Sequence, residues 1–320
     1  MNDAPDLIRL ASPDGRLLAY IAPDQGAELC GLEWEGHELL YRGRDFSPTP
    51  GWTGRAPILW PAIGRTFAPG PEPTAETFKQ APLGWTVDGV DYPMPMHGFA
   101  RSLPWRVEHH TTSELRLILD DSDQTRIFYP FGFRHALTYR LTDGLLTLDH
   151  EIEADEANTG PMPFAIGNHA TFNLPLLEDQ GATETTVASN ATHRMMLDAA
   201  GRPTGQTIPF ERFASPAPVS AIATFDVIPL SSAHEPPWAR LIDPSGLSLT
   251  VSHSAPDRAL STMEFITLWG DPGGGYLSLE AWLGKPNALA TADGACGLSP
   301  GSTLQWTVSV EVRQAARSRV

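Results

Sequence analysis

Residues 137–153, which read LTYRLTDGLLTLDHEIE, decide the class of fold. Apolar and polar residues alternate from Leu137 to Thr142, and the alternation resumes after Asp143-Gly144. Alternation places the two sets of side chains on opposite faces of a strand, and Asp-Gly is a favoured hairpin turn because it tolerates positive φ. The stretch therefore predicts a long antiparallel hairpin with one buried face. His150 lies in the apolar register, so we expect it in the core.

The same period of two recurs along the chain. Strands are expected at residues 16–22, 27–34, 105–110, 114–119, 276–282 and 304–312, and a second Asp-Gly turn at 88–89. Helical periodicity is scarce, and only residues 255–263 predict a short helix, with Ser254 as its N-cap. The proline-rich stretches 48–61, 69–82 and 216–237 are predicted to be long loops. We expect an all-β protein, a large antiparallel β-sandwich with few short helices, with residues 1–320 forming a single domain.

Charge and cysteine content limit the function. The formal net charge of −16 argues against a nucleic-acid or membrane partner, because phosphate groups bind basic patches. Cys30 and Cys296 are too few for a disulfide framework and are predicted to be reduced thiols. The first residues lack a signal-peptide pattern, and no apolar run approaches the ~20 residues of a membrane span. We expect a cytoplasmic monomer or homodimer that acts on a small molecule.

Two chemical motifs do not predict a site in this chain. Residues 297–301 read GLSPG and match the nucleophile pattern G-x-S-x-G. In that motif the residue after Ser donates a backbone N–H to the oxyanion hole, and Pro300 has no N–H to donate. No H-E-x-x-H or H-x-H pair predicts a metal site, so we expect no metal and no cofactor.

Three segments combine polar residues with proline, glycine and aromatic residues. They are PILWPAIGR at 57–65 with MHGFAR at 96–101, MPFAIGNHATFNLP at 162–175, and LW at 268–269 with LSLEAWLGKPN at 277–287. Aromatic faces suit the C–H side of a pyranose, and a few convergent polar groups can read its hydroxyls. Histidine and carboxylate side chains suit proton transfer near neutral pH. The segments together predict a sugar site.

In this order the segments resemble the signature blocks of the galactose mutarotase-like superfamily, and in particular the LacX-like branch of the aldose 1-epimerases. The resemblance extends over residues 57–287, which is most of the chain. It implies one large antiparallel β-sandwich and an isomerase that interconverts the α and β anomers of a free aldose without a cofactor. The block at His97 has the short form H-G-F-A-R rather than the longer signature of galactose mutarotases proper. A preference for galactose is therefore not implied.

The resemblance implies a catalytic role for three residues. Glu280 would be the general base on the anomeric hydroxyl, His169 the general acid toward the ring oxygen, and His97 would polarise that oxygen. Glu280 would then begin the reaction deprotonated and His169 protonated. Strand alternation places Glu280 on the opposite face from Leu277 and Leu279, as a site residue would require.

The resemblance also implies a set of substrate-binding residues. Arg65 would hold sugar hydroxyls, and Asp226 is the best match to an aspartate that family members place on the substrate. Trp269 and Trp282 are candidates for stacking on the sugar. For these two residues and for Trp60, core packing is the alternative that the sequence leaves open.

Three other functions remain open from the sequence. The first is a hexose-6-phosphate 1-epimerase on the same fold, for which Arg65, Arg101 and Lys285 are the nearby cations. The second is a non-catalytic sugar-binding protein. The third is a β-sandwich lyase or hydrolase of polysaccharides, which the missing paired-carboxylate pattern and signal peptide disfavour.

Overall fold

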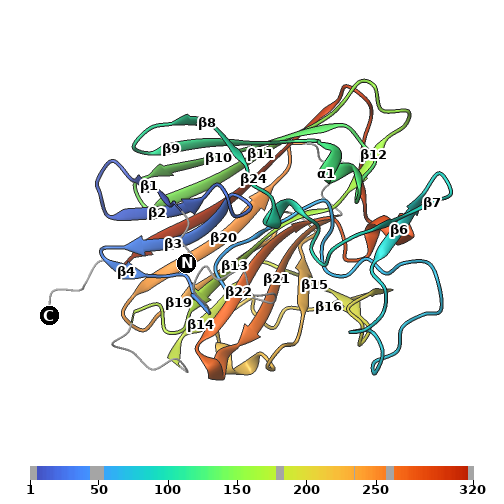
Figure 1. The fold of residues 1–320 in the computed structure, drawn as a ribbon. Helices are drawn as coiled ribbons and strands as arrows, with labels where there is room; N and C mark the ends of the chain where they lie inside the picture. Colours follow the sequence, from blue (N-terminus) through green and yellow to red (C-terminus); the bar gives the residue numbers. More distant parts are fainter. Residues whose placement is uncertain (1–5, 44–53, 178–183, 234, 257–262, 316–320) are drawn as a thin grey trace, which may run out of the picture.

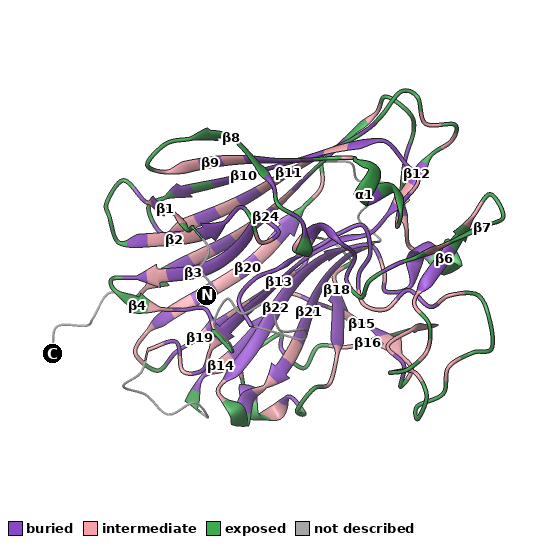
Figure 2. Cartoon of the chain, in the orientation of Figure 1, coloured by how far each residue is buried: buried purple, intermediate pink, exposed green. Residues whose placement is uncertain are grey.

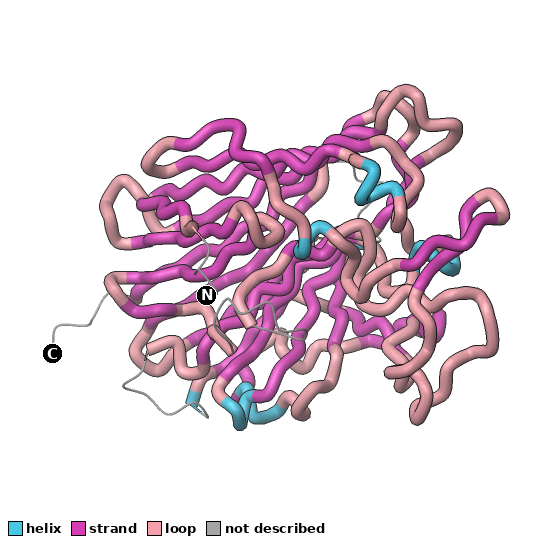
Figure 3. Tube along the Cα trace, viewed as in Figure 1, coloured by secondary structure: helices cyan, strands magenta, loops and turns pink. Residues whose placement is uncertain are grey.

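The computed structural model describes residues 6–43, 54–177, 184–233, 235–256 and 263–315, and strands dominate them (Figure 1, Figure 3). All strand pairings between named strands are antiparallel in this part of the chain, as the alternating sequence predicts. Its α-helices are short: α1 (Asp123–Arg126) and α2 (Ala288–Thr291). The all-β prediction is therefore confirmed.

The predicted hairpin lies in a nine-stranded sheet. It consists of β10 (Phe133–Thr142) and β11 (Leu145–Ala154), joined at Asp143-Gly144, where Gly144 has a φ of 73°. His150 is buried and lies 2.9 Å from a ring nitrogen of His135, so the prediction of a core histidine is confirmed. The order of the sheet is β17 (Ala217–Pro218), β14 (Thr186–Ser189), β19 (Trp238–Ile242), β20 (Leu247–Ser254), β24 (Thr303–Gln314), β11, β10, β9 (Glu114–Asp120) and β8 (Arg106–His110).

A seven-stranded sheet carries most of the segments singled out in the sequence. Its order is β16 (Pro203–Pro209), β15 (His193–Leu197), β18 (Ile228–Ser231), β21 (Glu264–Asp271), β22 (Tyr276–Leu283), β13 (Ile166–Asn173) and β5 (Ile58–Leu59). The prediction of a long loop at 216–237 is wrong in part, because β18 lies inside it and pairs with β21. Its short apolar run, Ile228 to Leu230, forms a strand because two neighbouring strands satisfy its backbone.

Smaller sheets and turns complete the described residues. The sheets are β1 (Ile8–Ala11), β2 (Leu17–Ala22), β3 (Glu28–Trp34) and β4 (His37–Glu38); β6 (Gly84–Val87) and β7 (Val90–Pro93); and β12 (Met162–Phe164) and β23 (Cys296–Leu298). Short 3-10 turns occur at η1 (Ala100–Ser102), η3 (Val219–Ala221) and η5 (Pro272–Gly274). Residues 257–262 of the predicted helix, and 48–53 of the first proline-rich stretch, lie outside the described residues.

The two large sheets share one cluster of buried hydrophobic residues, and many residues of their strands are buried (Figure 2). His253 on β20 donates a hydrogen bond to the Phe265 carbonyl on β21 over 2.8 Å, which links one sheet to the other. One hydrophobic cluster contains residues from Leu10 to Val312, and the interpretation of residues 1–320 as one domain stays a prediction. Among the described residues, no helix has the length and apolar character needed to cross a membrane.

Strand β22 is buried on both faces, and this positions the candidate site. Leu277 and Leu279 point into the shared core. Glu280 and Trp282 alternate with them on the other face, yet Glu280 is only 2% exposed. Loops therefore cover this face of the seven-stranded sheet, and polar groups on it are removed from bulk water.

Candidate active site

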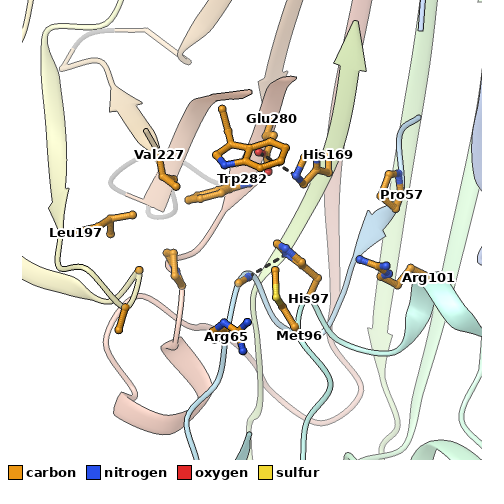
Figure 4. A pocket seen from close by; sticks show the side chains of 15 residues that line it. Pro57, Arg65, Met96, His97, Arg101, His169, Leu197, Val227, Glu280 and Trp282 are labelled. Atoms are coloured by element: carbon orange, nitrogen blue, oxygen red, sulfur yellow. Dashed lines mark hydrogen bonds and ion pairs between the residues drawn. The ribbon is translucent and has the colours of Figure 1, made fainter. Parts of the chain in front are cut away.

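A cavity of about 410 Å³ lies on the loop-covered face of the seven-stranded sheet. This volume falls within the usual range for small-molecule sites, which is roughly 300–1,000 Å³. Its lining includes the predicted site residues His97, His169 and Glu280 (Figure 4). Three residues that lie far apart in the sequence therefore share one sugar-sized cavity.

The register between β13 and β22 brings His169 and Glu280 together. The two residues are directly opposite in the antiparallel ladder, so their side chains leave the sheet on the same face. His169 Nε2 lies 3.3 Å from Glu280 Oε1, and both side chains are less than a tenth exposed. The other carboxylate oxygen, Oε2, accepts a hydrogen bond of 2.9 Å from the indole N–H of Trp282. Glu280 is therefore held from two sides.

Burial controls the protonation of this pair. It raises the pKa of Glu280 to about 8, against a lowering by the Trp282 hydrogen bond. It also lowers the pKa of His169 to about 4, with a smaller contribution in the same direction from the charge of Arg101. Desolvation disfavours the charged form of either group. The pair therefore carries one proton near pH 7, and the neutral form, with the proton on Glu280, is favoured.

The His97 side chain reaches the cavity from a loop that is hydrogen-bonded to the loop containing Gly64, which belongs to the first sequence block. The backbone N–H of Gly64 donates to His97 Nδ1 over 3.1 Å, and the backbone N–H of His97 donates to the Gly64 carbonyl oxygen over 2.8 Å. Because Nδ1 accepts, a neutral His97 carries its proton on Nε2. A Cβ atom at Gly98 would stand 2.1 Å from the Trp60 carbonyl oxygen, so only glycine allows the loops to approach this closely.

Two histidine rings and an indole form a continuous edge-to-face series. The ring centroids of His97 and His169 are 5.8 Å apart, and those of His169 and Trp269 are 5.4 Å apart. Burial lowers the pKa of His97 well below its ordinary value, and His169 when protonated, Arg101 and Arg65 act in the same direction. His97 is therefore a neutral hydrogen-bond donor to the cavity.

Arg65 and Arg101 also line the cavity, on the same side as His97 (Figure 4). The Arg65 guanidinium packs 5.5 Å from the ring centroid of Phe78. Glu28 lies close enough to Arg101 for the arginine's charge to lower its pKa, although burial raises that pKa overall. Glu28 also pairs with Arg55 over 3.1 Å, so its carboxylate is shared between two guanidinium groups.

The structure decides which of the three candidate tryptophans line the cavity and which one belongs to the core. Trp269 and Trp282 line the cavity, whereas Trp60 is fully buried among Phe99, Tyr129 and other rings. Trp60 is therefore a core residue.

Asp226 does not lie in the lining of the cavity. Arg194 donates to its carboxylate over 2.8 Å, and the next residue, Val227, lines the wall in its place. Lys285 is also outside the lining, because Asp293 pairs with its ammonium group over 2.8 Å. The structure thus brings together all of the predicted site residues except Asp226.

Several lining residues were not singled out by the sequence reasoning. Leu197, at the end of β15, and Val227, before β18, form an apolar wall opposite the arginines (Figure 4). Neither lies in a motif, and each reaches the cavity only through the pairing of peripheral strands. Among the described residues, no three His, Cys, Asp or Glu side chains cluster in a way that could hold a metal ion.

Comparison with solved structures places this fold among the galactose mutarotase-like proteins. A galactose mutarotase-related enzyme from Lactobacillus acidophilus is 21% identical, with a TM-score of 0.76 and coverage of 98% of this chain and 99% of that chain. Galactose 1-epimerase from Lactobacillus acidophilus NCFM is 17% identical, with a TM-score of 0.72 and coverage of 99% and 97%. A protein from Synechocystis sp. PCC 6803 is 25% identical, with a TM-score of 0.77 and coverage of 98% and 97%.

The family follows from the sequence match. The family described as Aldose 1-epimerase matches residues 7–310, and the chain belongs to this family. No curated protein matches the chain significantly in sequence. Membership makes the protein an epimerase-type isomerase, and the resemblance noted in the sequence is confirmed.

Proposed function

We propose that this protein is an aldose 1-epimerase that interconverts the α and β anomers of a free aldose by acid–base opening and closing of the sugar ring. The observation that carries the proposal is the buried contact of 3.3 Å between His169 and Glu280 on the floor of a sugar-sized cavity. The anomeric hydroxyl oxygen and the ring oxygen are bonded to the same carbon. An acid and a base that serve both oxygens must therefore be neighbours.

The reaction conserves the single proton of the pair. Transfer of that proton from Glu280 to His169 produces the ionised pair, which sugar hydroxyls in the cavity stabilise. Glu280 then removes the proton of the anomeric hydroxyl while His169 protonates the ring oxygen, and the bond between C1 and that oxygen breaks. Rotation about C1–C2 exposes the other face of the aldehyde, and the same groups close the ring in reverse. Each positioned proton transfer contributes ~10²–10⁴-fold.

The remaining lining suits a sugar. His97 and Arg65 are donors for the ring oxygen and hydroxyls, and the exposed part of the Trp269 indole offers an apolar face. The proposal departs from the sequence expectation in one respect, because the resting pair is neutral. The physical reason is desolvation, which opposes two separate charges on buried side chains.

Polarimetry of freshly dissolved α-anomers tests the proposal. A panel of glucose, galactose and other aldoses should show accelerated mutarotation with the protein, and Glu280→Gln should lower kcat by ~10²–10⁴-fold. Sugar binding by the variant, measured by calorimetry, should persist. Binding without any acceleration by the unaltered protein would instead identify a non-catalytic sugar-binding protein.

Hexose-6-phosphate 1-epimerase activity is the second candidate. It is favoured by the two guanidinium groups of Arg65 and Arg101 in the lining, where Glu280 is the only carboxylate among the described residues. Two observations weaken it. The Glu28 carboxylate interacts with Arg101, and the Lys285 ammonium group forms an ion pair with Asp293. A kcat/KM for glucose 6-phosphate well above that for glucose, and lost in Arg101→Gln, would select this candidate.

A further inference from the structure

We propose that Trp282 is a positioning residue for Glu280, and that Gly167 exists at its position to leave room for the Trp282 indole. The proposal rests on the proposed function, because it assigns Glu280 the role of general base. It changes the role expected for Trp282, from a stacking platform for sugar to a clamp on the carboxylate.

The clamp is a hydrogen bond between side chains on the same face of one strand. Glu280 and Trp282 are two residues apart on β22, and the indole N–H donates to Oε2 over 2.9 Å. With Oε2 engaged, Oε1 is left for His169 at 3.3 Å. The carboxylate is therefore fixed in rotation, with one oxygen assigned to each neighbour. A substrate hydroxyl then meets the Oε1 side of the carboxylate, next to the acid.

Gly167 is the cross-strand partner of Trp282 on β13, and it has no side chain to compete for the space. A Cβ atom there would stand 2.9 Å from Trp282 Cδ1, 3.1 Å from the Ala281 carbonyl oxygen and 3.2 Å from Leu59 Cδ1. Real Cβ atoms do not approach this closely, so the indole would have to move. On the other side Phe265 of β21 is its cross-strand partner. The Trp282 indole is therefore held between β13 and β21. A substitution at Gly167 on β13 can displace the indole without removing any packing atoms, whereas a smaller residue at Phe265 on β21 would remove them.

The clamp also has an electrostatic effect that can be measured. The indole N–H stabilises the ionised carboxylate and so lowers the pKa of Glu280, which burial raises to about 8. Loss of the N–H should therefore raise this pKa further. A variant that merely loosened the packing would admit water, which would lower the pKa. The alkaline limb of the pH–rate profile should therefore move to higher pH if Trp282 acts through its N–H, and to lower pH if Trp282 acts only through packing.

Trp282→Phe and Gly167→Ala test the proposal by polarimetry on the aldose with the highest rate. Trp282→Phe should lower kcat by about 10- to 100-fold, as expected for a lost hydrogen bond to a charged group, with a smaller change in KM. Its alkaline limb should move to higher pH. Gly167→Ala keeps the indole and displaces it. It should therefore lower kcat and move the alkaline limb to higher pH, both by less than Trp282→Phe does.

Two controls separate the possible outcomes. Gly297→Ala replaces another strand glycine, where a Cβ atom would meet nothing within 4 Å, and Trp238→Phe replaces a tryptophan on β19, in the other large sheet. Both should keep the full rate. Normal kcat and pH profile in Trp282→Phe, together with an inactive Glu280→Gln, would overturn the clamp and leave the proposed function standing. A fully active Glu280→Gln would instead remove the proposed function. If Trp282→Phe does not fold, Gly167→Ala with a normal rate and limb overturns the clamp alone.

Discussion

Replacing Glu280 by Gln should make the protein more stable while it removes the proposed base. The glutamine amide has the shape of a protonated carboxyl group. Its oxygen can accept from the Trp282 indole and its NH₂ can donate to His169, so both contacts of the native side chain are kept. What disappears is the need to take up a proton on folding. The variant therefore isolates the cost of burying this carboxyl group.

The magnitude follows from the pKa of Glu280, which folding raises from 4.5 to about 8. A raised carboxyl pKa means that the folded chain binds a proton that the unfolded chain has released above pH 4.5, so stability falls as pH rises toward 8. At pH 7 the separation from 4.5 is two and a half pH units, and each unit corresponds to about 1.4 kcal/mol. Glu280→Gln should therefore gain up to about 3 kcal/mol at pH 7, and little near pH 5.

Urea unfolding followed by tryptophan fluorescence measures this difference at several pH values between about 5 and 8. The free energy of unfolding of the variant should exceed that of the native protein by an amount that grows with pH. Glu153→Gln, at an exposed glutamate of β11, controls for the loss of one surface carboxylate. A difference that stays constant from pH 5 to pH 8 would refute the claim that Glu280 is protonated in the folded protein.

Three further predictions concern the same site. The rate should be highest between about pH 4 and about pH 8, because below this window both members of the His169–Glu280 pair hold a proton and above it neither does; a pH profile of kcat/KM without these limbs would contradict the one-proton pair. Asp226→Asn should leave KM within about twofold in a sugar titration, since Asp226 is outside the cavity lining, and a rise of about tenfold would place it on the substrate. Gly98→Ala should lower the free energy of unfolding in urea by more than ~2 kcal/mol and should also lower kcat. A Cβ atom at this position would meet the Trp60 carbonyl oxygen at 2.1 Å, so the loop that carries His97 must move. Native stability and rate in this variant would show that the close approach is unimportant.

Much of the fold could be predicted from the sequence because strand structure is local. Alternation of apolar and polar residues and an Asp-Gly turn were enough to predict the central hairpin, which the structure forms with Leu141 opposite Leu146. Alternation also placed Glu280 on the face away from Leu279. The short run at Ile228 was missed, because a strand of four residues among prolines has too little pattern and depends on its neighbours β15 and β21.

For the site, the sequence determined which side chains are candidates for the proposed chemistry, through residue types in blocks that resemble a family. It did not determine how they meet. His169 and Glu280 lie far apart along the chain, and only the pairing register of β13 with β22 sets them opposite each other. The same register places Gly167 beside Trp282, which turns an expected sugar platform into a partner of the carboxylate. Protonation, too, was decided by tertiary structure, since the pKa of Glu280 depends on how completely the surrounding loops exclude water, and no local pattern in the sequence contains that quantity.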